Sequence, residues 1–176
     1  MIIGVEHPAY FYTATILNWN YLLKNDQYKR FITDSLKFMV EDKRIYVYGF
    51  TIMPNHIHLC MSIREGHELS DIKNSFMKFT AQRMKLDMLH SNDPALENFI
   101  STQRDRKYQI WERNALAIPI YSREVMEQKL NYIHNNAIQE KWRLAEFPEQ
   151  YFFSSAAFYY LNKDDWGFIT HYMEHM

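Results

Sequence analysis

The sequence of 176 residues predicts an α+β fold built on one antiparallel sheet. Segments with strand character alternate with segments of helical periodicity, in the order β-α-β-β-α-β-α. Residues are 47% hydrophobic, with only 4 Gly and 5 Pro, which favours a sizeable core without linkers. The first six elements have the order of a ferredoxin-like unit, and the seventh adds a C-terminal helix. We expect a single domain over residues 1–176, with a core at about 9–140 and a tail at 141–176 that packs on it.

The first half of the chain predicts three strands and one helix. Residues 9–17 are rich in aromatic and β-branched side chains, which is typical of a strand. A helix is expected over about 21–41, because its apolar residues recur at helical spacing. Residues 44–51 and 56–63 predict an antiparallel hairpin, since a Met-Pro-Asn turn separates two strand-like runs.

The second half predicts two helices and one strand. Apolar residues at helical spacing indicate a helix from Leu69 to about Leu89. Residues 90–107 are polar and irregular, so we expect a loop there. Residues 108–120 can supply a strand. The last helix is expected from Ser122, a favourable N-cap residue, to about Gln139.

Composition excludes several classes of protein. The formal net charge of −1 argues against a protein that holds nucleic acid by charge alone. A single cysteine, Cys60, rules out an internal disulfide and fits a reducing compartment. No apolar run is long enough for a membrane span, and the N-terminus lacks the pattern of a secretory signal. We therefore expect a cytoplasmic protein with no membrane partner.

His56 and His58 form the first group of residues with chemical potential. They stand two apart on a predicted strand, so both imidazoles project from the same face. Two imidazoles on one face can hold a divalent cation and leave positions for a third ligand and a substrate oxygen. The alternative is that the two histidines line a polar sheet face.

The predicted last helix carries the second group. Its apolar stripe comprises Met126, Leu130, Ile133 and Ala137. Tyr132 and Asn136 lie one turn apart on a different face of this helix. A tyrosine beside a metal ion can attack a phosphate, although a tyrosine at an interface can also serve packing alone.

These motifs resemble those of the single-tyrosine HUH transposases, in particular the REP-associated and insertion-sequence branch. GFTIMPNHIHLCMSI is similar to the family's Met-Pro-Asn-His-hydrophobic-His stretch, and NYIHNNAIQEKW to the helix with its tyrosine. LSDIKNSFMKFTAQRMK, IWERN and YFFSSAAFY resemble further segments of the family, in the same order. The similarity runs over about residues 10–160. One departure is Ala137, which stands where the family often has Pro.

The resemblance implies a role for each of these residues. The family's metal-binding pair falls on His56 and His58, its third metal ligand on Asn136, and its nucleophile on Tyr132. The implied cofactor is a divalent metal ion, Mg²⁺ or Mn²⁺. The implied reaction is the cleavage and rejoining of single-stranded or hairpin DNA through a 5′-phosphotyrosine, in transposition or in the processing of hairpin repeats. Family members include dimers whose tyrosine helix serves the partner's histidine pair, so a homodimer is a further expectation.

Basic side chains of the middle helix, the polar loop and the segment after it are candidate DNA contacts, although a solvated surface explains them equally well. They are Lys78, Lys85, Arg104, Arg106, Lys107 and Arg113.

Two other functions stay open. A domesticated transposase could bind DNA hairpins without cutting them. His-x-His-x-Cys, ending at Cys60, also resembles a histidine-triad motif of nucleotide hydrolases, but that interpretation leaves Tyr132 and Asn136 without a role.

Overall fold

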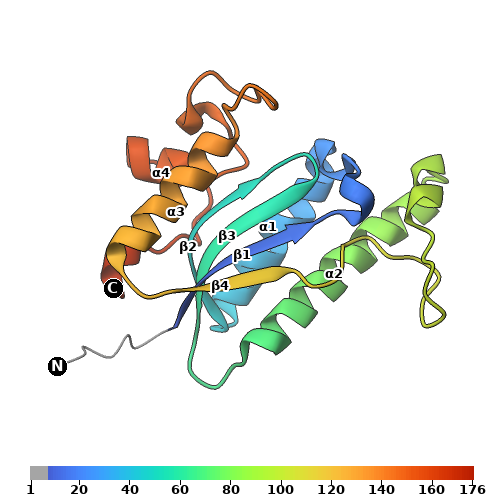
Figure 1. Cartoon of the computed structure of the whole chain (residues 1–176), viewed down its shortest axis with the longest axis horizontal. Coiled ribbons are helices and arrows are strands. Elements are labelled where there is room, and N and C mark those ends of the chain that lie inside the picture. Colours follow the sequence, from blue (N-terminus) through green and yellow to red (C-terminus); the bar gives the residue numbers. More distant parts are fainter. Residues whose placement is uncertain (1–7) are drawn as a thin grey trace.

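The computed structural model describes residues 8–176 and contains one four-stranded antiparallel sheet (Figure 1). The strands are β1 (Ala9–Thr15), β2 (Ile45–Ile52), β3 (His56–Ile63) and β4 (Leu116–Ile120). They lie in the order β2-β3-β1-β4, and every neighbouring pair is antiparallel. Together with the helices between them, this order confirms the predicted ferredoxin-like arrangement.

Helices cover both faces of the sheet (Figure 1). On one face, α1 (Asp26–Glu41) and α2 (Leu69–His90) enclose the larger apolar core. On the other face, α3 (Arg123–Asn136) covers a smaller apolar cluster, and the short α4 (Ala156–Leu161) lies beside it. No helix within residues 8–176 combines the length and the apolar character needed to cross a membrane.

Strand β3 is buried along its whole length because it is an inner strand with both faces covered. Ile57 and Leu59 point into the larger core beneath α1 and α2, whereas Cys60 joins the cluster beneath α3. Since side chains alternate along a strand, His56 and His58 share the α3 face with Cys60. Period-two alternation thus directs two imidazoles toward the C-terminal helix.

Helix α1 begins later than predicted. The expected helix started near residue 21, but residues 22–24 form a separate 3₁₀ turn. The side chain of Asn25 accepts a hydrogen bond from the Gln27 N–H and caps α1, which fixes the helix start at Asp26. The last helix also ends earlier than predicted, at Asn136 instead of about Gln139.

The stretch after α2 differs most from the prediction. Within the expected loop over 90–107, residues Pro94–Phe99 form a 3₁₀ helix that buries Leu96 and Phe99. The strand expected over 108–120 is regular only at Leu116–Ile120. Trp111 still pairs with Ile16 beyond the end of β1, and its Nε1–H donates to the Thr80 hydroxyl in the core. The strand is interrupted between Trp111 and β4, where Asn114 has a left-handed backbone with φ of 62°.

Segments after α3 cover the outer edge of β2. The N–H groups of Ile52 and Ser155 bond across to the carbonyls of Phe153 and Phe50, respectively. Farther along, the Thr170 N–H donates to the Val47 carbonyl. The C-terminal segments of the chain therefore pair with backbone N–H and C=O groups along this edge of the sheet.

Candidate active site

The paired histidines lie side by side in β3. Their ring centroids are 4.7 Å apart, and the two residues are only 8% and 6% exposed. His56 stands opposite Thr15 of β1 in the strand register, and His58 stands opposite Thr13. The sheet thus fixes the backbone of both residues by pairing on either side of β3.

Each imidazole is oriented through its Nδ1 atom. His56 Nδ1 lies 2.7 Å from Asn55 Oδ1, and His58 Nδ1 lies 2.9 Å from Thr13 Oγ1. Because an amide oxygen only accepts, His56 donates through Nδ1 and keeps a lone pair on Nε2. The Nε2 atom of His58 is buried and has no hydrogen-bond partner among the described residues. An orphaned buried nitrogen in a polar site is typical of an open ligand position.

Electrostatics keeps both histidines neutral. Burial lowers the pKa of His56 to about 4, with a smaller contribution from the charge of Lys141. Burial also lowers the pKa of His58 to about 3, assisted by His56 and Lys129. A neutral imidazole with a free Nε2 lone pair is the form that binds divalent metal ions.

Helix α3 brings two further polar residues to this pair. Its first turn is capped by the Ser122 hydroxyl, which accepts from the Val125 N–H. Tyr132 lies over the sheet, with ring centroids 5.3 Å from His58 and 6.1 Å from Phe11. This ring stays 49% exposed, so its hydroxyl-bearing side chain is accessible from solvent.

Asn136 lies one turn after Tyr132 and is buried next to His56. Its Nδ2 atom is 3.4 Å from His56 Nε2. Within residues 8–176, no three side chains of His, Cys, Asp or Glu come together as metal ligands. A third protein ligand beside the two histidines would therefore be of another type, and the Asn136 amide supplies an oxygen of the kind that Mg²⁺ and Mn²⁺ accept. The residues present fit a divalent cation.

The rear face of α3 is anchored to the sheet. His134 Nε2 lies 2.7 Å from Ser155 Oγ, which also accepts from the Phe50 N–H and lies 3.2 Å from the Phe50 carbonyl. Burial lowers the pKa of His134 to about 4, so it is neutral at pH 7 and donates through Nε2 when the serine proton goes to the carbonyl. The Ser155 hydroxyl then accepts two hydrogen bonds and donates one, so its hydrogen-bonding groups are all paired.

Gly49 leaves room for a side chain of this helix on β2. A Cβ atom on Gly49 would overlap the side chain of Leu130 and stand 3.0 Å from Ser155 Oγ. Because residue 49 has no side chain, the end of the Leu130 side chain can pack directly against β2.

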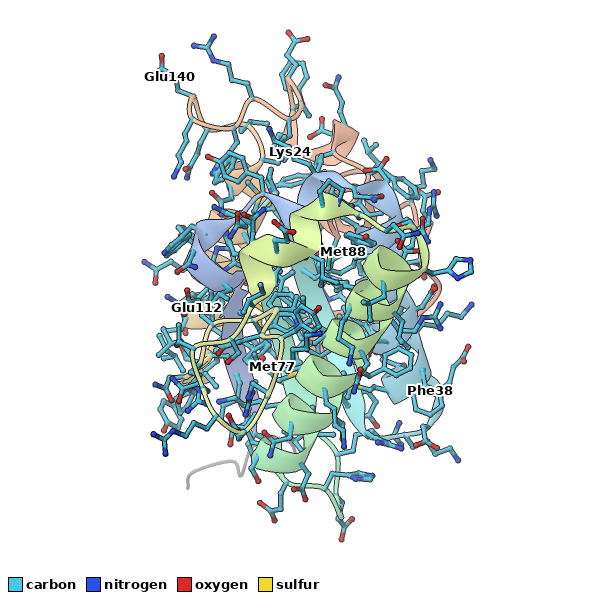
Figure 2. The ribbon with its side chains drawn as sticks, turned by 90° about the vertical axis from the view of Figure 1, so that its right-hand side faces the viewer. Lys24, Phe38, Met77, Met88, Glu112 and Glu140 are labelled. Carbon is cyan, nitrogen blue, oxygen red and sulfur yellow. The ribbon has the colours of Figure 1, made fainter. Side chains whose placement is uncertain are left out.

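Five of the six predicted basic DNA contacts line one cavity of about 790 Å³. We call this cavity the α2 groove; it is formed by one face of α2 over residues 74–85 and by the loop over 105–114 (Figure 2, where Met77 and Glu112 mark the two walls). The five are Lys78, Lys85, Arg106, Lys107 and Arg113, whereas Arg104 does not line it.

The α2 groove is separate from the histidine pair. Its wall residues Met77 and Ala81 pack on the core between α2 and the sheet, opposite to the α3 face. Asp105 pairs with Arg106 at 2.7 Å and with Arg113 at 3.7 Å, but neither Lys78 nor Lys85 forms an ion pair within the described residues. The groove therefore keeps a net positive charge.

Several residues around the site were not predicted from the sequence. Thr13 and Asn55 orient the two imidazoles, and Lys129 places its Nζ atom 4.7 Å from the centroid of the Phe11 ring. Lys129 is three residues before Tyr132, a spacing that puts both on one side of a helix and could have been noticed. The role of Thr13 depends on the cross-strand register, for which the sequence has no local signal.

Cys60 follows the two histidines on the same face of β3. It is fully buried beneath α3, and burial raises the pKa of its thiol to about 12. A thiol in this position cannot reach a bound nucleotide, which weakens the histidine-triad interpretation.

Comparison with known proteins places these features in context. The family model described as "Transposase IS200 like" matches residues 15–136. The fold is similar to a REP-associated tyrosine transposase bound to a REP hairpin, with a TM-score of 0.60 and 16% identity over 85% of this chain and 76% of that one. A putative transposase from Deinococcus radiodurans gives a TM-score of 0.49 and 18% identity over 73% of this chain and 90% of that chain. The comparison with curated proteins gave no match.

Proposed function

The chain belongs to the IS200-like transposase family, and from that premise we propose that it cleaves and rejoins single-stranded DNA with Tyr132 as the nucleophile. The observation that carries the proposal is that one chain brings Tyr132 and Asn136 to His56 and His58, with Asn136 beside His56 Nε2 and with His58 Nε2 unpaired among the described residues. The DNA hairpin bound to the structurally similar transposase supports a substrate with a folded single strand.

His56, His58 and Asn136 would hold the divalent metal ion, Mg²⁺ or Mn²⁺. When bound, such an ion polarises a phosphate oxygen and favours charge on the oxygens of the scissile phosphodiester. Asn55 and Thr13 keep the two imidazoles in the orientation that turns Nε2 toward that position.

In the proposed reaction, the Tyr132 hydroxyl oxygen attacks the phosphorus. A bond forms between this oxygen and the phosphorus, and the bond from phosphorus to the 3′ oxygen breaks. The phenol proton goes to solvent, and the 3′ oxygen leaves as a hydroxyl after taking up a proton. The 5′-phosphotyrosine conserves the ester bond, so a second 3′-hydroxyl can reverse the step and join new strands without another energy source.

Two features of α3 assist this step. The half-exposed ring of Tyr132 leaves its hydroxyl open to a strand that approaches from solvent. Lys129 lies on the same side of the helix and brings a positive charge toward the phosphate under attack.

The α2 groove is the proposed contact surface for the rest of the DNA. Its lysines would neutralise phosphates without reading base sequence. The loop over 105–114 that forms one wall of the groove is linked to the candidate active site. The Asn18 N–H donates to the Glu112 carboxylate of this loop, and the ring of Trp19, the next residue after Asn18, lies 6.3 Å from the His56 ring.

Covalent capture tests the proposal. End-labelled hairpin DNA with single-stranded flanks is incubated with the protein and Mn²⁺, separated by denaturing electrophoresis, and any adduct is mapped by peptide mass spectrometry. We expect an adduct on Tyr132 that requires the metal. DNA binding without any adduct would instead favour the non-cutting hairpin binder.

A further inference from the structure

Three aromatic rings gather at the outer end of the candidate active site. Trp19 and Trp142 place their ring centroids 6.3 and 6.0 Å from that of His56, and Tyr21 lies 5.8 Å from Trp142. We call Trp19, Tyr21 and Trp142 the aromatic cluster. Trp19 is 60% exposed and Tyr21 is 48% exposed, so both rings are accessible from solvent.

The cluster comes from two segments that lie far apart in sequence. Trp19 and Tyr21 belong to the connection between β1 and α1, and Trp142 follows α3. Figure 2 shows both segments at the same end of the molecule, where Lys24 and Glu140 mark them. The fold thus brings exposed rings together next to one histidine of the pair.

The backbone holds Trp19 in an unusual conformation. Asn18 and Trp19 both have left-handed backbone angles, with φ of 53° and 56°. A bulky side chain rarely adopts this region, and such strain is concentrated at functional sites. Asn55 holds the conformation in place, because its Nδ2 donates to the Trp19 carbonyl while its Oδ1 accepts from His56. One asparagine therefore ties the exposed ring to the imidazole.

The cluster is flanked by cations. Lys24 Nζ lies 4.8 Å from the centroid of the Tyr21 ring, and Lys141 Nζ lies 4.8 Å from that of Trp142. Neither lysine forms an ion pair with an acidic residue in the part of the chain that the structure describes. The exposed Trp19 ring and the neighbouring lysines match the two parts of a nucleotide, a flat base and an anionic phosphate.

We propose that the aromatic cluster is a stacking subsite for an unpaired nucleobase close to the scissile phosphate. This inference rests on the proposed function, which places that phosphate at His56 and His58. The 6.0 Å between the His56 and Trp142 ring centroids is less than two nucleotide steps of roughly 3.4 Å along one strand, so the base on the cluster belongs to a nucleotide next to that phosphate. The subsite accepts a single strand because a paired base inside a duplex has both faces covered, and it tolerates any base because every base has a π-face.

Equilibrium binding tests the subsite without chemistry. In a Tyr132→Phe background with EDTA, affinity is measured for a short oligothymidylate and for an abasic oligomer of equal length and charge. We expect Trp19→Asn to weaken oligothymidylate binding by about tenfold and to leave abasic binding unchanged. Asparagine tolerates the left-handed backbone, so this variant removes the ring and keeps the turn. Trp19→Phe is expected to restore most of the affinity.

Control variants complete the experiment. Phe38→Ala removes an exposed ring far from the site and is expected to change neither affinity (Figure 2). Trp142→Leu removes a ring of the cluster from its other segment and is expected to weaken oligothymidylate binding in the same way. This second variant keeps the test valid if Trp19→Asn fails to fold. Unchanged oligothymidylate affinity, an equal loss for the abasic oligomer, or a change in oligomeric state without a change in affinity would each overturn the subsite.

The two proposals fail in distinguishable ways. If the unmodified chain forms the Tyr132 adduct and Trp19→Asn binds oligothymidylate normally, only the stacking subsite is wrong. If the unmodified chain binds no DNA, both proposals are wrong.

Discussion

The ring of Tyr132 lies 5.3 Å from the ring of His58 within the same chain. The helix with the tyrosine and the strand with the histidines thus meet without a second copy of the protein. Under the proposed function, one chain would contain all the side chains needed for one cleavage event.

Replacing Tyr132 with Phe removes the proposed attacking oxygen and keeps the ring that contacts His58 and Phe11. We expect the covalent DNA adduct to disappear, while hairpin binding and unfolding stability stay within about 0.5 kcal/mol of the original. Gel electrophoresis under denaturing conditions measures the adduct. Tyr121→Phe is the matched control, because Tyr121 is 81% exposed just before the same helix, and it should leave the adduct intact. An adduct that persists in Tyr132→Phe assigns the nucleophile elsewhere.

Replacing His56 and His58 together with Ala should abolish Mn²⁺ binding, because it removes both of the proposed imidazole ligands. Isothermal titration calorimetry measures the binding, and circular dichroism checks that the fold is retained. A His90→Ala variant, at the exposed end of α2, serves as the control and should bind Mn²⁺ like the original protein. Undiminished binding in the double variant would rule out these two residues as ligands.

Reversing charge in the α2 groove should weaken DNA binding and reduce its dependence on salt. For Lys78→Glu with Lys85→Glu, we expect the slope of log affinity against log salt to fall by about 0.7 for each lost contact with single-stranded DNA. Fluorescence anisotropy over a salt series measures this slope. Lys37→Glu with Lys43→Glu makes the same charge change on the surface near α1, and an equal effect there would mean that the groove has no special role.

Removing the Ser155 hydroxyl should loosen the anchor of α3. In Ser155→Ala, the Phe50 N–H and the His134 ring lose their partner, and leaving buried groups unsatisfied costs about 1–3 kcal/mol. Urea unfolding measures this loss, and the yield of the DNA adduct is expected to fall with it. Ser91→Ala, at the exposed end of α2, should change the stability by less than about 0.5 kcal/mol. Equal stability of the two variants would contradict the role of the Ser155 hydroxyl in holding α3 on the sheet.

The metal-free protein should lose stability on the acid side. The pKa values of His56, His58 and His134 are lowered from 6.5 to about 4, 3 and 4 in the folded state. Below pH 6.5 the unfolded chain therefore binds protons that the folded chain does not, so the free energy of unfolding falls as the pH drops from 6.5 toward 4. Urea midpoints in EDTA at several pH values measure this trend.

In the variant that combines His56→Gln with His58→Gln, the free energy of unfolding should depend less on pH. His90→Gln changes an exposed histidine and should leave the pH dependence as it is. A stability that stays level or rises on acidification would contradict the neutral, buried state of these imidazoles.

The sequence predicted those features of the fold that depend on local periodicity. The alternation in β3 placed His56 and His58 on one face, and helical spacing put Tyr132 and Asn136 on one side of α3. Their catalytic and metal-binding roles stay predictions, but the structure brings the four together. The left-handed backbone of Trp19 and the pairing of Thr13 with His58 had no such signal, since they depend on contacts between segments distant in sequence. The left-handed backbone of Asn114, which interrupts the strand before β4, was not predicted either.

The missing side chain of Gly49 has a consequence for how copies of such a gene decay. A copy that keeps its histidines and its tyrosine would ordinarily be counted as intact. With alanine at position 49, however, the added methyl group would overlap the end of the Leu130 side chain, so Leu130 would have to change its rotamer between α3 and β2. Such a copy would carry a packing defect beneath the tyrosine helix that an inspection limited to the residues that perform the chemistry would not detect.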